Sequence, residues 1–274
     1  MADWLKVLIL GVIEGFTEFL PISSTGHLLV ASSLLDFHSN LNSTFEIFMQ
    51  FGALIAVVLF YRAELLRQVQ TVRTDAAVRR LWLNVIIAFM PAGLVGFFLH
   101  GWVKANLVDT SSNAPIVAAA LIVGGVIFLL VERSRPGNVG VAELADITPT
   151  QALLVGIAQV TALIPGVSRA GASIIAGLLV GLRRETATAF SFYLAIPTLG
   201  VATAFDLLTN LDRLDGATLL LLILGIIVSA LVAWFAIGWL LRYVSRNTFV
   251  PFGYYRIVAG LAILLLIAMR ILPA

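Results

Sequence analysis

Six long apolar stretches constrain the fold of this chain more than any other feature. About 20 helical residues cross a bilayer, and a stretch of this length with few charges is typical of a transmembrane helix. The whole composition agrees, because 60% of the 274 residues are hydrophobic and only 12% are charged, against about 25% charged residues in soluble domains. The sequence therefore predicts an all-α polytopic membrane protein. The six predicted transmembrane helices are residues 45–61, 82–100, 114–132, 188–208, 217–241 and 252–272.

Four further apolar stretches are too short or too interrupted to cross a membrane, which favours re-entrant helix-loop-helix pairs. Each of the two pairs is broken at a proline and a cluster of small polar residues. A shift of 145 residues relates one pair to the other, which predicts an internal repeat of approximately 1–132 and 148–272 within a single membrane domain, residues 1–274. The pairs are 4–20 with 26–36 and 151–164 with 170–181, and the coinciding positions include Gly11 and Gly156, Glu14 and Gln159, Ser23 and Ser168, and Gly26 and Gly171.

The arginines orient the two repeats. Cytoplasmic loops of membrane proteins carry an excess of basic residues, and four basic clusters alternate with loops that have no such excess. Tracing the spans between them puts both termini outside, so the first pair enters from the outer face and the second from the cytoplasmic face. The copies are then inverted, and we expect their broken tips to meet near the midplane. The clusters are Arg62 to Arg80, Arg133 with Arg135, Arg183 with Arg184, and Arg242 with Arg246.

The first break concentrates polar residues in this apolar setting. Glu14 and Glu18 are four residues apart, so on a helix both carboxylates project from one face. Pro21 is expected to end that helix. An ionised side chain at mid-bilayer costs roughly 3 kcal/mol on insertion scales, so partners, water or a ligand must offset it. The alternative is that both glutamates lie at a helix end in the headgroup layer and bind nothing. The break continues with Ser23, Ser24 and Thr25, which are N-cap residue types, and with His27.

The second break has the residues of an anion site. Gly166 lets the backbone approach a ligand closely, and Ser168 is placed to cap the following helix. The free N–H groups at a helix start bind anions, most commonly phosphate. Arg169 adds a planar fork that matches phosphate oxygens, although a snorkelling cation is the alternative reading. The two breaks together indicate a site for a phosphate ester or anhydride with a divalent cation.

Charge and cysteine content exclude other classes of site. The net charge is only +2, which does not indicate binding of nucleic acid or another polyanion. The sequence has no cysteine, so disulfides and thiolate metal sites are excluded.

Three motifs in order carry a family resemblance. They are Glu14-x-x-x-Glu18, Pro21-x-Ser-Ser-Thr-Gly-His27 and Pro165-Gly-x-Ser-Arg169, and with them the whole chain resembles the integral-membrane undecaprenyl-pyrophosphate phosphatases of the bacitracin-resistance type. The resemblance implies hydrolysis of C55-isoprenyl pyrophosphate to the monophosphate and phosphate, which recycles the lipid carrier of bacterial cell-wall synthesis. It also implies dependence on Mg²⁺ or Ca²⁺, a multi-pass location in the bacterial inner membrane, and an active site opening to the periplasmic face. A homodimer is compatible with the family.

The resemblance also implies roles for individual residues. Glu14 and Glu18 would hold the metal ion, since hard divalent ions take carboxylate oxygens. Ser24 would be the nucleophile, or His27 would be the nucleophile or a general base that aligns water; each could instead be a helix cap. Arg169 would clamp the pyrophosphate. Ser23, Thr25, Gly166, Ser168 and Ser173 complete the predicted substrate-binding set. The family usually has Ser-Arg-Ser-Gly-x-Thr in the second motif, whereas this chain has Ala170 and Ser173.

A transporter or lipid flippase is the alternative function. Inverted repeats with broken helices that meet at the midplane are a recurring transporter plan, and the fold alone favours that class. The glutamate pair and Arg169 would then bind a coupling ion and an anionic headgroup. A transporter has no need of a hydroxyl and a histidine beside a phosphate clamp, so hydrolysis of a lipid pyrophosphate separates the two readings.

Overall fold

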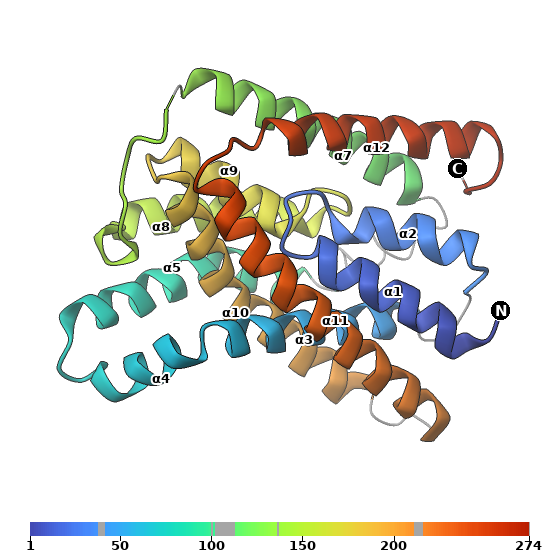
Figure 1. Ribbon diagram of the computed structural model, residues 1–274, viewed down its shortest axis with the longest axis horizontal. Helices are drawn as coiled ribbons and strands as arrows, with labels where there is room; N and C mark the ends of the chain where they lie inside the picture. Colours follow the sequence, from blue (N-terminus) through green and yellow to red (C-terminus); the bar gives the residue numbers. More distant parts are fainter. Residues whose placement is uncertain (38–41, 100, 102–112, 136, 211–215, 274) are drawn as a thin grey trace.

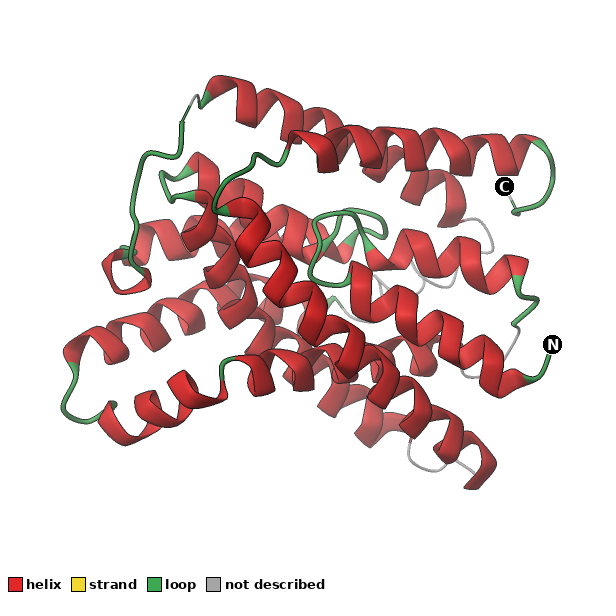
Figure 2. Ribbon diagram, in the orientation of Figure 1, coloured by secondary structure: helices red, strands yellow, loops and turns green. Residues whose placement is uncertain are grey.

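The computed structural model describes residues 1–37, 42–99, 101, 113–135, 137–210 and 216–273, and these residues form helices and loops without a named β-strand (Figure 2). The predicted all-α class is confirmed. The helices are α1 (Asp3–Thr17), α2 (Ser24–Leu34), α3 (Asn42–Phe60), α4 (Arg62–Thr71), α5 (Ala76–Phe98), α7 (Asn113–Ser134), α8 (Pro149–Val160), α9 (Arg169–Leu179), α10 (Arg184–Asn210), α11 (Gly216–Val244) and α12 (Val250–Ala268), with short 3₁₀ helices η2 (Leu144–Asp146) and η3 (Thr161–Leu163).

A long helix coincides with each of the six predicted spans. Among the described residues, α5, α7, α10, α11 and α12 are each long and apolar enough to cross a membrane. The described part of α3 meets the same criterion when it is counted together with α4, which follows after a bend of 69°. Large apolar side chains such as Phe97, Leu130, Phe235 and Val258 are exposed on these helices, as contact with lipid requires. The chain is a multi-pass helical membrane protein.

The four short helices form the two broken pairs. α1 ends at Thr17, earlier than the position of Pro21 suggests. The reason is local, because a proline ring clashes with the carbonyl group four residues before it, which is that of Thr17. Glu18 keeps helical backbone angles as the C-cap, and turns follow before α2 begins at Ser24. In the second pair, α8 continues into η3, and α9 begins at Arg169.

The two breaks share an uncommon backbone conformation. Ser23 and Ser168 have φ angles of 71° and 72°, which residues other than glycine rarely adopt. Each serine caps the helix that follows, and its hydroxyl oxygen accepts a hydrogen bond from the backbone N–H of Gly26 (3.4 Å) or Gly171 (3.1 Å). These are the residues that the shift of 145 superposes, so the local geometry agrees with the predicted repeat.

Each broken pair packs on a span from the other half of the sequence. α1 lies against α11, and α8 lies against α5. The helices approach closely at glycines: a Cβ atom on Gly11 would lie 3.2 Å from the carbonyl oxygen of Gly225, and one on Gly156 would collide with the carbonyl oxygen of Ala88. In Figure 1, α1 and α2 enter from the end that holds both chain termini, whereas α8 and α9 enter from the opposite end. This arrangement agrees with an inverted relation between the pairs.

The basic clusters gather at one end of the molecule. The α4–α5 turn, the end of α7, the start of α10 and the end of α11 all lie at the end opposite the termini (Figure 1). The segment after α7 is held there by backbone hydrogen bonds, from the N–H of Val141 to the oxygen of Gly181 (2.9 Å) and from the N–H of Arg183 to the oxygen of Val141 (3.0 Å). A buried ion pair between Glu132 and Arg184 joins α7 to α10 nearby.

Candidate active site

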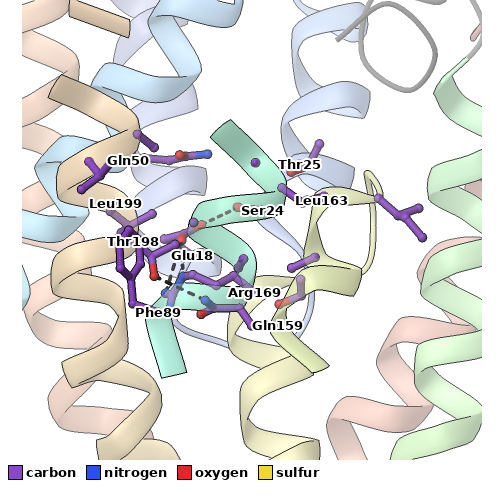
Figure 3. Close-up of a pocket in the computed structure, with 18 of the residues that line it drawn as sticks. Glu18, Ser24, Thr25, Gln50, Phe89, Gln159, Leu163, Arg169, Thr198 and Leu199 are labelled. Atoms are coloured by element: carbon purple, nitrogen blue, oxygen red, sulfur yellow. Dashed lines mark hydrogen bonds and ion pairs between the residues drawn. The ribbon is translucent and has the colours of Figure 1, made fainter. Parts of the chain in front are cut away.

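A cavity of about 400 Å³ lies where the two breaks meet the spans α3, α5 and α10. Its polar lining comes from both breaks, with two glutamines and a threonine from the surrounding helices, and Figure 3 shows several of these side chains converging. The cavity therefore brings together most, but not all, of the residues that the sequence singled out. The polar residues that line it are Glu18, Ser23, Ser24, Thr25, Gln50, Gln159, Ser168, Arg169 and Thr198.

Glu18 links the two breaks at the cavity wall. The hydroxyl of Ser24 donates a hydrogen bond of 2.7 Å to its Oε2 atom. Its Oε1 atom faces the guanidinium of Arg169, with Nε and Nη2 both 3.4 Å away (Figure 3). Charge-assisted hydrogen bonds in proteins are usually shorter, about 2.7–2.9 Å. Because both contacts are long, the N–H groups of Arg169 can donate instead to a more strongly charged ligand.

Arg169 is held in place by groups other than its carboxylate partner. Its Nη1 atom donates to the carbonyl oxygen of Ser191 at 3.1 Å, and its guanidinium carbon lies 5.7 Å from the ring centre of Phe19, a cation–π contact. Ser173 does not line the cavity. Its hydroxyl lies 2.9 Å from the carbonyl oxygen of Arg169 and 2.7 Å from the hydroxyl of Ser191, so it braces the arginine from behind.

The starts of α2 and α9 both lie at this cavity. Ser23, Ser24 and Thr25 line it from the first helix, and Ser168 and Arg169 line it from the second. The N–H groups of a first helical turn have no intrahelical acceptor, and the helix dipole adds a positive partial charge at the same point. Gly166 also lines the cavity and has a φ angle of 92°. A Cβ atom there would lie 2.7 Å from the backbone of Val117, so only glycine fits the turn.

Glu14 and its repeat counterpart Gln159 have different positions. Glu14 is completely buried on α1 and does not line the cavity, although it interacts electrostatically with Arg169. Gln159 lines the cavity and donates weakly to the hydroxyl of Thr198, at 3.5 Å. Its Oε1 atom is buried without a hydrogen-bond partner among the described residues. Gln50 of α3 also lies in the cavity wall.

His27 points away from this cavity. It lines a second, largely apolar cavity of about 890 Å³ between α1, α2, α11 and α12. One ring nitrogen, Nδ1, lies 2.7 Å from the carbonyl oxygen of Ser23, and the other, Nε2, lies 2.6 Å from the hydroxyl of Tyr255, whose ring stacks on the imidazole. Both nitrogens are thus engaged by protein groups. In this geometry His27 supports the backbone next to Ser24 and does not reach the cavity.

Arg256 is the residue that sequence reasoning missed. It is buried on α12, and its guanidinium donates to the carbonyl oxygens of Pro21, Gly166 and Val167, at 3.1–3.2 Å, and to that of Ala120 on α7. One side chain therefore joins the loop of the first break to the loop of the second. An arginine inside a predicted span was the available signal, because such residues are costly in a membrane and are generally functional or paired.

The donor set at the cavity fits a divalent cation of the Mg²⁺ type. In the part of the chain that the structure describes, no three His, Asp or Glu side chains come together. Mg²⁺ is usually held by one or two carboxylates and completes its shell with water and substrate phosphates. The carboxylate of Glu18 in the cavity wall and the buried carboxylate of Glu14, one helical turn earlier, suit that mode of binding. They do not provide the all-protein cage of a structural metal site.

Comparison with known proteins agrees with the motifs. The family model described as bacitracin resistance protein BacA matches residues 7–262. A protein of Methylobacillus flagellatus is 46% identical over 264 residues, which is 95% of this chain and 96% of that protein. A protein of Deinococcus radiodurans is 44% identical over 273 residues, 98% of this chain and 97% of its own length. A protein of Acidovorax ebreus is 44% identical over 260 residues, 95% and 93% of the two chains, and all three relatives are named undecaprenyl-diphosphatase. The family resemblance of the motifs is thereby confirmed, and the chain belongs to the bacitracin resistance protein BacA family.

Proposed function

We propose that this protein hydrolyses undecaprenyl (C55-isoprenyl) pyrophosphate to undecaprenyl phosphate and phosphate, and so recycles the lipid carrier of bacterial cell-wall synthesis. The observation that carries the proposal is the convergence of Glu18, Ser24 and Arg169, from two separate breaks, on one buried cavity within a membrane protein. The name shared by relatives that cover nearly the full length of the chain supports the same substrate.

Arg169 and the two helix starts bind the pyrophosphate. The guanidinium fork matches two phosphate oxygens, and backbone N–H groups at the starts of α2 and α9 can donate hydrogen bonds to the remaining oxygens. Phosphoryl transfer requires mainly positioning and electrostatic stabilisation from the protein. A divalent cation held by Glu14 and Glu18 would neutralise charge on the pyrophosphate oxygens. Gln159 and Gln50 can orient the substrate through hydrogen bonds from the opposite wall.

Ser24 is the nucleophile that the geometry favours. Its hydroxyl already donates to Glu18 at 2.7 Å, so Glu18 can accept the proton as the oxygen attacks the terminal phosphorus. The bond from that phosphorus to the bridging oxygen breaks, and undecaprenyl phosphate leaves. Glu18 passes its proton to the departing undecaprenyl phosphate and becomes a carboxylate again. Water then attacks the phosphoserine and gives a proton to Glu18, the bond from phosphorus to the Ser24 oxygen breaks, that oxygen takes the proton back from Glu18, and phosphate departs. His27 holds the carbonyl group of Ser23 and so positions Ser24. Of the two candidates that the sequence left open, Ser24 and His27, we therefore propose Ser24 assisted by Glu18.

The proposed location is the bacterial inner membrane, with the site toward the periplasm. The basic ends of α7 and α11 and the α4–α5 turn would face the cytoplasm by the positive-inside rule. The parts of α5 and α10 that line the cavity, residues 89–97 and 198–205, belong to the halves of these helices that lie farthest from the basic loops. The cavity would therefore be reached from the outer leaflet.

The test is phosphate release by purified protein in detergent. We expect hydrolysis of C55- and C15-prenyl pyrophosphate that stops with EDTA and returns with added Mg²⁺ or Ca²⁺. The transporter alternative predicts movement of a lipid pyrophosphate between the leaflets of proteoliposomes, with no phosphate released. The hydrogen bond between Ser24 and Glu18 favours hydrolysis, because it pairs a hydroxyl nucleophile with a proton acceptor, an arrangement that transport does not require.

A further inference from the structure

The short helix α4 has one face that is apolar in its middle, basic at both ends and exposed. Leu66 and Val69 are 62% and 73% exposed on this face. Arg62 begins the helix on the same side, four residues before Leu66. Arg73 comes four residues after Val69, just beyond the C-cap Val72, which keeps helical backbone angles. Both arginines are exposed, so the whole face is available to a partner.

The opposite face of α4 is held by a buried hydrogen-bond network. Gln68 is buried there, and its amide nitrogen donates to the carboxylate of Glu64 (2.8 Å) and to the hydroxyl of Tyr193 on α10 (3.0 Å). Its amide oxygen accepts a hydrogen bond of 3.0 Å from the indole N–H of Trp82 on α5. Both donors and the acceptor of the amide are engaged. This network fixes α4 against α5 and α10, with the leucine and valine directed outward.

Aromatic residues place the middle of α4 at the edge of the bilayer. The rings of Tyr61 and Trp82 pack on that of Tyr193, with centres 5.2 and 5.8 Å away. Tyrosine and tryptophan are enriched where a membrane meets water, and Trp82 is the first residue of the predicted span 82–100. Because Gln68 bonds to two members of this cluster, the exposed leucine and valine beside it lie at the same depth.

The surroundings of this face are strongly basic. Residues 62–80 contain five arginines and two acidic residues, a net charge of +3. Arg67 pairs with Glu64 at 2.6 Å and with Asp75 at 3.8 Å. Among the described residues, the other four arginines of the segment have no ion-pair partner. They are Arg62, Arg73, Arg79 and Arg80.

We propose that the exposed face of α4 is a docking surface for anionic phospholipids in the leaflet at the basic end of the molecule. Arg62 and Arg73 would bind the headgroup phosphates, and Leu66 and Val69 would lie against the upper part of the acyl chains. An acidic protein segment would match the charges, but it would not account for apolar side chains exposed at the depth of the bilayer edge. The inference does not depend on the proposed hydrolysis.

Site-specific labelling can test contact with lipid, because the sequence has no cysteine. Val69→Cys places a fluorophore on the proposed surface, and Val139→Cys, at a 76% exposed valine in the segment after α7, is the matched control. The labelled proteins would be placed in nanodiscs of phosphatidylcholine with phosphatidylglycerol. In one series only the phosphatidylglycerol is brominated next to its headgroup, and in the other only the phosphatidylcholine. We expect brominated phosphatidylglycerol to quench the label at position 69 at least twofold more than brominated phosphatidylcholine, and neither lipid to quench the label at position 139.

Charge variants identify what the surface recognises. Arg62→Gln combined with Arg73→Gln should remove the preference for phosphatidylglycerol, whereas Arg270→Gln, at an exposed arginine near the end of α12, should preserve it. All three side chains are exposed, so these variants should melt at the temperature of the unmodified protein in pure phosphatidylcholine. Equal quenching by the two lipids at position 69 would overturn recognition of anionic lipid, and no quenching would overturn docking on the bilayer. Loss of the preference on addition of soluble polyglutamate would assign the surface to an acidic protein segment instead.

Discussion

Replacement of Arg256 by methionine tests whether one side chain sets the relation between the two breaks. Methionine keeps much of the length and packing of the side chain but has no donor. The change removes hydrogen bonds to four carbonyl oxygens, on the loops of both breaks and on α7. Side-chain hydrogen bonds between membrane helices average about 0.6 kcal/mol and reach about 1.7 kcal/mol. Since the donor is charged and the acceptors are buried, we expect a loss on the order of 3 kcal/mol in the free energy of unfolding.

Both the melting temperature and kcat should fall in Arg256→Met. For a chain of this size, a loss of this order lowers the melting temperature by roughly 10 °C. A displacement of 1 Å at a reacting centre can cost about 100-fold in rate. The loops that Arg256 holds carry Ser23 and Ser24 on one side and Ser168 and Arg169 on the other. We therefore expect kcat to fall about 100-fold in Arg256→Met while the fraction of folded protein, measured by size exclusion in detergent, stays high.

Two further variants make the experiment decisive. Arg256→Lys keeps the charge and up to three donors, but an ammonium is a compact charge and cannot span both loops, so both losses should be intermediate. Gly124→Ala leaves Arg256 in place but puts a Cβ atom into its guanidinium, so it should act in the same direction. Arg246→Met, at an exposed arginine, is the control and should change neither quantity. If Arg256→Met kept the kcat and melting temperature of the unmodified protein, the bridging role would be refuted.

The remaining predictions concern the two glutamates, the serine and the arginine of the proposed active site. Glu18→Gln should reduce kcat by about 10²–10⁴-fold, the usual contribution of a general base, and Arg169→Ala should abolish turnover; near-normal rates in either, measured as phosphate release, would contradict their roles. Ser24→Ala should leave no phosphoserine detectable by mass spectrometry after a rapid quench and should remove activity, whereas substantial residual hydrolysis would exclude the seryl route. Glu14→Gln should raise the Mg²⁺ concentration needed for half-maximal rate at least tenfold, and an unchanged metal requirement would remove Glu14 from the metal site.

Hydropathy and helix-breaking residues predicted the fold well. Six apolar stretches became six long helices because a bilayer accepts few other structures that satisfy the backbone. The breaks could be placed from Pro21 and from the serines that cap α2 and α9, because both effects are local in sequence. The end of α1 was placed a few residues too late, since the clash of a proline acts on the carbonyl group four residues earlier.

Contacts between distant parts of the chain could not be predicted in the same way. His27 was placed on the correct helix, but its orientation depends on Tyr255, which comes from the last span. Arg256 donates a hydrogen bond to the carbonyl oxygen of Pro21, which lies 235 residues earlier in the sequence. No short sequence motif can indicate a contact between residues so far apart. The predicted inverted repeat placed the tips of both breaks near the midplane, so Glu18 and Arg169 were expected to lie close together, and the structure pairs them. This contact could be predicted from the sequence because the expected repeat indicated which distant segments lie close together.

The exchange of packing partners between the halves has a consequence for biosynthesis. α1 rests on α11, which leaves the ribosome only when nearly all of the chain has been made. Until then the first hairpin, with Glu14 and Glu18, lacks the helix on which α1 packs most extensively. Seating of that hairpin is therefore one of the last events of membrane insertion. A chain that stops before α11 would lack the main packing partner of α1, so it could not hold Glu18 at the cavity in the same way.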